Sequence, residues 1–207
     1  MASVADDTPM LSRSRIVLIT VVIVVALDQI TKSWAVGLND GRTVDVVGSL
    51  RFRLAFNTGM AFSKGQGQGV IITLVALVIV GVMIWMARSA RSPITRVAIG
   101  LVIGGAIGNI VDRLLRDGLP GQARGFLGGA VVDFIDLQWW PTFNVADAAI
   151  CVGGVLVAVM LGREERLAAQ AEAGVVAAGS AETSGGESGG ESVDNPIDNP
   201  IDAAVDG

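Results

Sequence analysis

Long hydrophobic stretches alternate with polar segments along the chain. Each of four stretches is close to the ~20 residues that an α-helix needs to cross the hydrocarbon core of a bilayer. We therefore expect four membrane-spanning helices. They cover residues 16–38, 70–87, 94–115 and 143–161.

Two further patterns indicate how these segments are arranged. Gly100, Gly104 and Gly108 recur at every fourth position of the third stretch, a spacing that lets a neighbouring helix approach closely. Between the first two stretches, residues 50–56 alternate between apolar and polar side chains, which is typical of a half-buried strand. Residues 126–137 are a second strand candidate. The predicted fold is a membrane all-α bundle of four helices with a small extracytoplasmic β-sheet.

Composition supports a membrane protein and narrows its chemistry. Hydrophobic residues make up 51% of the 207-residue chain, and the mean hydropathy is +0.59. The chain has no His and a single cysteine, Cys151. This excludes a His-dependent catalytic triad, a zinc site built from His and Cys ligands, and a disulfide within the chain. We expect neither a metal nor another cofactor.

The charge divides the chain into a membrane body and an acidic tail. Residues 163–207 contain ten acidic residues and two arginines, whereas residues 1–162 contain thirteen basic and ten acidic residues. We expect a cytoplasmic N-terminus over 1–15, a four-span domain over 16–162, and a cytoplasmic tail over 163–207. The tail is rich in Gly, Ser, Ala and acids, so we expect it to be largely disordered.

Basic residues predict the orientation. With four spans, three Arg-containing segments lie on one side, which the positive-inside rule makes cytoplasmic. Both termini would then be cytoplasmic in a multi-pass protein of the bacterial inner membrane. Trp34, Trp139 and Trp140 would mark the outer interface and Trp85 the inner one. The arginines are Arg13, Arg15, Arg88, Arg91, Arg96, Arg163 and Arg166.

Polar residues within the spans fall at one depth. Asp28 and Lys32 lie roughly 18 and 24 Å from the cytoplasmic start of the first span at 1.5 Å per residue, which places them in its outer half. Other segments bring polar groups to the same level, the boundary of the outer leaflet. Ionisable residues inside a membrane are energetically costly and usually functional. The further polar residues are Asn57, Asn109, Asp112, Arg113, Asp133, Asp136, Asn144 and Asp147.

Eight of these ten residues also have a purely structural interpretation. Asp28 and Lys32 are four residues apart and can pair on one helix face. Asp112 and Arg113 could be a charge pair at a helix end. Asn144 and Asp147 resemble a capping box, with Asp in place of the usual Glu or Gln. Asp133 and Asp136 could be solvated loop carboxylates.

Without His or a Cys pair, carboxylates remain as the acid–base groups. Two neighbouring carboxylates share a proton, so one can activate water while the other donates a hydrogen bond to a carbonyl. This is the chemistry of aspartic peptidases. Asp147 is one candidate member, and Asp112 and Asp133 both lie at the right level to be its partner.

Five motifs resemble those of lipoprotein signal peptidase, or signal peptidase II. They occur in the family's order and on the expected spans and loops, and they cover residues 15–162. They read "LDQITKSWA" (27–35), "NTGMAFS" (57–63), "GNIVDR" (108–113), "VVDF" (131–134) and "FNVADAAI" (143–150).

The resemblance implies an aspartic endopeptidase at the outer leaflet of the inner membrane. Its substrates would be prolipoproteins, which it would cut before the diacylglyceryl-modified lipobox cysteine. It implies inhibition by globomycin-type peptides and a β-cradle outside the membrane. We expect contact with membrane lipids, a monomer and no nucleic-acid partner. The implied catalytic pair is Asp133 and Asp147, with Asp28, Lys32, Asn57, Asn109, Asp112, Arg113 and Asn144 binding substrate or supporting the pair.

One segment departs from the family's pattern. The stretch 114–130 is longer than the family leads us to expect, and it adds Asp117 and a Gly/Pro-rich flap. This leaves Asp136 as a nearby competitor for the role assigned to Asp133. Two alternatives belong to other classes of protein: a carrier or proton-coupled membrane protein, in which Asp28, Lys32, Asp112 and Asp147 form an ion path, and a non-catalytic membrane scaffold. A presenilin-like protease is disfavoured, since the GxGD pattern is absent.

Overall fold

The computed structural model describes residues 10–37, 42–59, 68–90, 92–116, 127 and 129–185. The stretch 117–126, which contains Asp117, lies outside this part of the chain. Two compact units divide the molecule, Met1–Gly162 and Arg163–Gly207. The first unit contains the sheet and most of the membrane-spanning helices, and it carries the polar site.

Four helices are long and apolar enough to cross a membrane, which confirms the predicted number of spans. Two of them extend past the hydrophobic stretches: the first begins earlier in the chain, and the last continues beyond the end of its stretch. Their bounds are α1 (Met10–Gly37), α2 (Gln68–Ser89), α3 (Pro93–Leu115) and α4 (Val145–Gly185).

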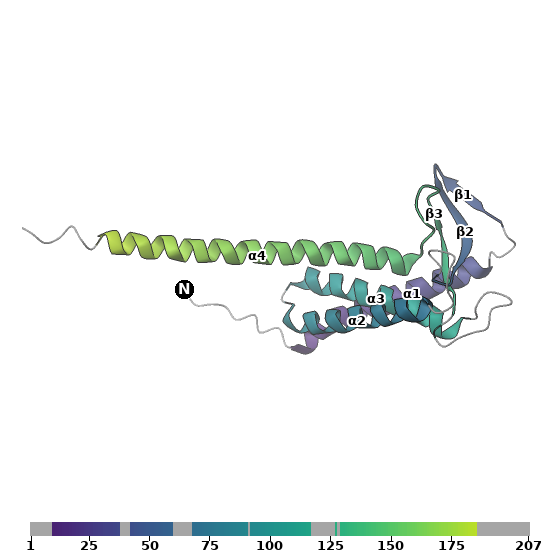
Figure 1. Ribbon diagram of the computed structural model, residues 1–207, viewed down its shortest axis with the longest axis horizontal. Coiled ribbons are helices and arrows are strands. Elements are labelled where there is room, and N and C mark those ends of the chain that lie inside the picture. The colour runs from purple at the N-terminus through teal and green to yellow at the C-terminus, as the bar shows by residue number, and fades with distance from the viewer. Residues whose placement is uncertain are drawn as a thin grey trace, which may run out of the picture. The chain divides into compact units, whose positions relative to one another are not determined.

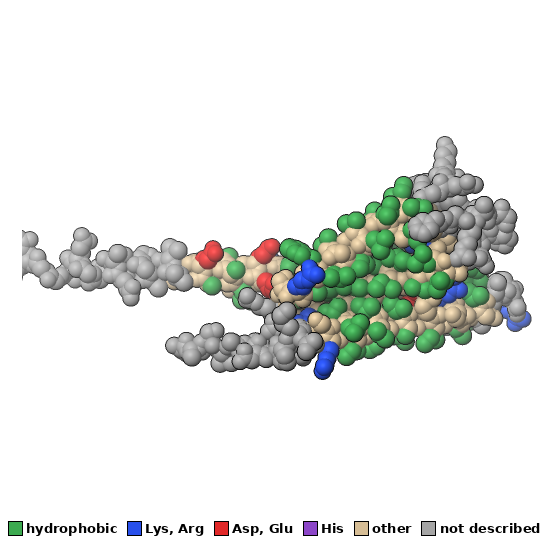
Figure 2. Space-filling model, turned by 90° about the horizontal axis from the view of Figure 1, so that it is seen from below, with side chains coloured by type: hydrophobic (Ala, Val, Ile, Leu, Met, Phe, Trp, Pro, Cys, Tyr) green, Lys and Arg blue, Asp and Glu red, His purple; other side chains and the backbone are tan. Residues whose placement is uncertain are grey.

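The central helix of the bundle is α3. In its most apolar segment 61% of the residues are buried, against 6% to 22% in the other helices. Ser92 caps its N-terminus by accepting a hydrogen bond from the backbone N–H of Ile94, and Pro93 occupies the first turn, where no N–H is needed. The other helices expose their apolar side chains on the flank, as a lipid-facing surface does (Figure 2).

The glycines of α3 allow α1 to pack against it closely. A Cβ added to Gly104 would lie 2.8 Å from Val24 Cβ, and one at Gly100 would lie 2.7 Å from Thr20 Cβ. Such distances are too short for real side chains, so larger residues would separate the helices. The glycine spacing seen in the sequence therefore fixes the distance between α1 and α3, which carry most of the buried polar residues.

A three-stranded antiparallel sheet confirms the predicted strands. It consists of β1 (Val44–Val47), β2 (Leu50–Asn57) and β3 (Val131–Asp136) in the order β1-β2-β3. The pairing of β2 with β3 shifts register between Phe52 and Ala55. Figure 1 shows the sheet at one end of the bundle, where α1 ends and α4 begins.

Aromatic side chains dock the sheet onto α1. The Trp34 ring lies edge-on to Phe52 at 5.3 Å between centroids and to Phe134 at 6.2 Å. Val132 and Phe134 are buried with Ala35 in the same apolar cluster. Because this cluster anchors β3, the backbone around residue 133 is held against the helix bundle.

The second unit is described from Arg163 to Gly185, where α4 continues. The predicted tail, residues 163–207, begins in this unit, and α4 continues through its first part as far as Gly185. Ala and Glu dominate residues 164–173, and both residue types favour helix. The acidic repeat at the end of the chain lies outside the described residues.

Candidate active site

A capping box formed by Asn144 and Asp147 closes the N-terminus of α4. The backbone N–H of Asp147 donates to Asn144 Oδ1 at 3.0 Å, and the backbone N–H of Asn144 donates to Asp147 Oδ2 at 3.1 Å. Reciprocal bonds of this kind satisfy N–H groups that the first helical turn leaves without partners. They also fix the orientation of the Asp147 carboxylate.

The side chain of Asn144 connects the two candidate catalytic residues. Its Nδ2 donates to Asp133 Oδ1 at 2.7 Å, while its Oδ1 accepts the backbone N–H of Asp147. Asn109 donates to Asp147 Oδ1 at 2.8 Å, and its own Oδ1 accepts from Asn144 Nδ2 at 3.3 Å. Asp133 and Asp147 therefore share one amide side chain, although they come from β3 and α4.

Asp133 lies in a site that favours its protonated form. It is only 4% exposed. Burial raises the pKa of Asp133 from 3.8 to about 6, and the nearby negative charge of Asp147 acts in the same direction. Hydrogen bonds from Asn144 and Asn57 oppose this rise. Asp133 therefore retains its proton in a pH range where free carboxyl groups have lost theirs.

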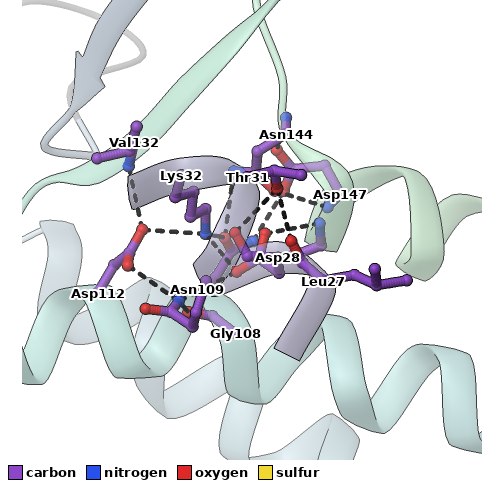
Figure 3. A network of polar contacts seen from close by, with 12 residues as sticks. Leu27, Asp28, Thr31, Lys32, Gly108, Asn109, Asp112, Val132, Asn144 and Asp147 are labelled. Atoms are coloured by element: carbon purple, nitrogen blue, oxygen red, sulfur yellow. Dashed lines mark hydrogen bonds and ion pairs between the residues drawn. The ribbon is translucent and has the colours of Figure 1, made fainter. Parts of the chain in front are cut away.

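Lys32 is the centre of a buried ionic network (Figure 3). Its Nζ lies 2.8 Å from Asp28 Oδ2 and 3.0 Å from Asp112 Oδ2, and it donates to Asn109 Oδ1 at 3.0 Å. Lys32, Asp28 and Asp112 are completely buried. All three donors of the ammonium group thus have acceptors, as a charge buried at this depth requires.

The acids of this network bind backbone next to the candidate pair. Asp28 Oδ1 accepts the N–H of Ala146 at 3.0 Å, one residue before Asp147. Asp112 Oδ2 accepts the N–H of Val132 at 3.1 Å, one residue before Asp133. Since Lys32 contacts both acids, a single ammonium group links the two chain segments that carry the candidate pair.

Two members of the network were not singled out from the sequence. Gln29 Nε2 donates to Asp28 Oδ2, to Asp112 Oδ1 and to the carbonyl of Gly108, at 3.1 to 3.2 Å. Arg116 Nε lies 2.8 Å from Asp112 Oδ1. The spacing of four residues between Asp112 and Arg116 could have indicated that pair, whereas the contacts of Gln29 with α3 leave no such local signal.

Asp136 is engaged elsewhere. It forms ion pairs with Arg51 at 2.8 Å and Arg53 at 2.9 Å, and it accepts the backbone N–H of Gln138. The N–H of Gln138 and the two guanidinium groups hold the pKa of Asp136 below its ordinary value. These contacts favour Asp133 over Asp136 as the partner of Asp147. Asp112 is likewise engaged in ion pairs, with Lys32 and Arg116, so Asp133 is favoured over Asp112 as well.

Two cavities flank the candidate pair. Asp147 lines one of about 330 Å³ and Asp133 lines another of about 450 Å³, with Asn57 lining both. Arg113 contributes a cation to the smaller cavity. It is 6% exposed, and its Nε has no hydrogen-bond partner among the described residues. The other walls of this cavity are mainly apolar and include Ile72, Ala76, Ala106, Val131 and Ile150.

The structure brings the candidate residues to one end of the bundle, where the sheet meets α1, α3 and α4. In the described part of the chain, no group of three or more His, Cys, Asp or Glu side chains could hold a metal ion. The residues brought together are Asp28, Lys32, Asn57, Asn109, Asp112, Arg113, Asp133, Asn144 and Asp147.

The four spans, the small sheet and the buried carboxylates define a polytopic membrane protein with a polar site at one end of its bundle. The chain belongs to the signal peptidase II family, because the family model described as Signal peptidase (SPase) II matches residues 20–162. It is therefore a membrane protease.

Relatives and solved structures agree with this assignment. The chain is 40% identical over 159 residues to a lipoprotein signal peptidase of Rhodococcus jostii (strain RHA1), covering 75% of this chain and 77% of that relative. It is 41% identical over 150 residues to one of Mycobacterium avium (strain 104), covering 72% and 79%. A solved bacterial membrane enzyme superposes with a TM-score of 0.59 at 26% identity, over 72% of this chain and 88% of that one.

Proposed function

We propose that this protease is an aspartic endopeptidase that removes signal peptides from prolipoproteins, cutting before the diacylglyceryl-modified lipobox cysteine. The relatives named above are lipoprotein signal peptidases. The observation that carries the aspartic assignment is the Asn144 side chain, which links Asp133 and Asp147 through hydrogen bonds to both residues. Because the pKa of Asp133 is raised, this member of the pair is protonated at mildly acidic pH.

In the proposed mechanism Asp133 holds the shared proton and Asp147 is the base. The carboxylate of Asp147 takes a proton from a water molecule as that water attacks the scissile carbonyl carbon. Asp133 donates a hydrogen bond to the carbonyl oxygen and stabilises the tetrahedral intermediate. The C–N bond then breaks, and a proton passes to the departing amine of the cysteine. Acid–base catalysis of this kind contributes about 10²- to 10⁴-fold.

Arg113 and Asn57 face the space where substrate would lie. The unpaired Nε of Arg113 can donate to a backbone carbonyl of an extended peptide, and its charge lies within reach of Asp147 and Asp133. Asn57 lies between the two cavities and contacts Asp133. These positions suit residues that align a peptide across the pair.

The remaining polar residues position the pair. Lys32 connects Asp28 and Asp112, and each of these carboxylates binds the backbone beside one catalytic residue. Asn109 and Asn144 hold the carboxylates themselves. Catalysis needs groups fixed to within fractions of an ångström, and this network supplies such fixation at the edge of a fluid bilayer.

The depth of the site fits a lipidated substrate. A diacylglyceryl group remains in the bilayer, so the adjacent peptide bond lies near the membrane surface. The apolar walls of the smaller cavity on α2, α3 and α4 suit the membrane-embedded signal peptide. We further propose that the sheet end faces outward from the inner membrane, that both termini are cytoplasmic, and that the protein acts as a monomer.

The test is a cleavage assay in detergent with a diacylglyceryl-modified precursor as the substrate. The variants Asp133→Asn and Asp147→Asn are purified and assayed separately. Both variants should lose about 10²- to 10⁴-fold in kcat, because each removes one acid–base group. Asp136→Asn is the matched control, because the Asp136 carboxylate is paired with Arg51 and Arg53 instead of with the candidate pair. This variant should retain the wild-type rate per mole of folded protein. Wild-type rates in either Asp133→Asn or Asp147→Asn would refute the proposed pair.

A further inference from the structure

A separate groove lies at the end of the bundle opposite the candidate active site. The helix α2 relates the two places: Ile72 lines the active-site cavity and Arg88 lines the groove. Sixteen residues of helix separate them, which corresponds to about 24 Å. The groove has a volume of about 260 Å³ and is lined by Ser14, Val17, Ile84, Ala87, Arg88 and Ile103.

The lining combines an apolar wall with a cationic rim. Val17, Ile84 and Ile103 come from α1, α2 and α3 and form the wall, while Arg88 lies in the last turn of α2. One helical turn, about 6 Å, separates Ile84 from Arg88. The groove is thus long enough to hold the glycerol region and the first carbons of an acyl chain, with an anion at its rim.

The surroundings indicate that the occupant comes from the bilayer. The neighbouring surface of α2 is apolar, with Val82 46% and Trp85 69% exposed. Hydrophobic side chains run along the flank between the basic groups at the two ends of the bundle (Figure 2). A molecule that reaches the groove along this flank must itself be soluble in lipid.

The positive charge around the groove favours anionic lipids over other lipids. The sequence between Ile84 and Ile103 contains no acidic residue, and neither does the segment 14–17. Arg88 is the only cation among the residues that line the groove. Basic pockets between membrane helices attract anionic headgroups, because the charge pairs with phosphate where the dielectric constant is low.

We propose that this groove binds an anionic phospholipid of the leaflet at that end, with its phosphate on Arg88 and an acyl chain against Val17, Ile84 and Ile103. The lipid fills the space that Ala87 leaves between α1 and α2. It would couple the packing of these helices to membrane composition at a site remote from the peptidase chemistry.

The test is native mass spectrometry of the full chain in a phosphate-free detergent. The protein is titrated with dioleoylphosphatidylglycerol or dioleoylphosphatidylcholine, which share acyl chains and differ in net charge. The wild type should bind the anionic phosphatidylglycerol about fivefold more tightly than the phosphatidylcholine, as expected for one interfacial cation. Arg88→Gln should abolish this preference. Ile84→Trp fills the groove with a large side chain and should weaken the binding of both lipids.

Arg15→Gln is the matched control, because Arg15 lies at the same end but does not line the groove. It should keep the preference of the wild type. An equal loss in Arg15→Gln and Arg88→Gln would show diffuse attraction and would overturn the proposal, as would an unchanged preference in Arg88→Gln. Lipid binding that appears only after deletion of residues 2–9 would assign the groove to the chain's own N-terminal segment and would also overturn it.

Discussion

Replacement of Asp133 by Asn should stabilise the protein at neutral pH while abolishing catalysis. A pKa raised from 3.8 to about 6 corresponds to about 3 kcal/mol, at about 1.4 kcal/mol per tenfold change in proton affinity. Since the folded-state pKa lies above the unfolded value, the penalty is absent below about pH 4 and complete above about pH 6. Ionised Asp133 therefore destabilises the folded state at pH 8.

An amide avoids this penalty but disturbs one hydrogen bond. The amide oxygen of the Asp133→Asn variant can still accept from Asn144 Nδ2, whose bond to Asp133 Oδ1 is 2.7 Å. The new NH₂ group would face Asn57, whose side-chain oxygen already accepts the N–H of Gly59, and this mismatch costs about 1 kcal/mol. Asp133→Asn should be more stable than the wild type by about 2 kcal/mol at pH 8, and less stable by about 1 kcal/mol at pH 4.

The assay is reversible unfolding of the purified protein by SDS in mixed micelles at both pH values, together with cleavage activity at pH 7. Asp45→Asn is the control, because it removes a carboxylate that is exposed on the edge strand and should change stability by no more than about 0.5 kcal/mol. A stability difference between Asp133→Asn and the wild type that is the same at both pH values would refute the proposed desolvation of Asp133.

Three further predictions follow from the network and the helix packing. Lys32→Met leaves Asp28 buried without a cation and Asp112 with Arg116 alone, so it should lower the free energy of unfolding by about 3–5 kcal/mol and abolish cleavage; wild-type stability in unfolding assays would contradict this. Gly108→Ala places a Cβ 2.6 Å from Asp28 Oδ2 and should destabilise the fold by about 1–3 kcal/mol. Gly154→Ala, whose Cβ meets nothing within 4 Å, should be neutral or slightly stabilising in the same unfolding experiment. The pH profile of kcat/KM should fall on its alkaline side with an inflection near pH 6, where the proton of the pair is lost, and a profile that is flat from pH 5 to about 8 would contradict this assignment.

Much of the fold could be predicted from local patterns. The length of an apolar run decides whether a helix can cross the bilayer. The predicted bounds of the first three spans therefore lie within two residues of the observed candidate spans, as does the start of the fourth. The alternation in residues 50–56 similarly identified β2 (Leu50–Asn57). The continuation of α4 to Gly185 was not predicted, because the end of a hydrophobic stretch does not require the end of a helix.

The site could be predicted as a level along the helices but not as a set of contacts. Residue counts along each span predict that Asp28 and Lys32 lie at the level of the other polar groups, and the structure has Lys32 in contact with Asn109 and Asp112. The bonds from Ala146 to Asp28 and from Val132 to Asp112 join distant segments, and no local spacing encodes them. Such contacts depend on how the sheet docks on the bundle, so they emerge only from the tertiary structure.

The most direct test of the proposed function compares a diacylglyceryl-modified prolipoprotein with an identical precursor that carries no lipid. The purified protein is incubated with each, and mass spectrometry identifies the N-terminus of the product. Cleavage of the lipidated precursor alone, with the modified cysteine as the first residue of the product, is the predicted result. Equal cleavage of both precursors, or a cut at another bond, would contradict it.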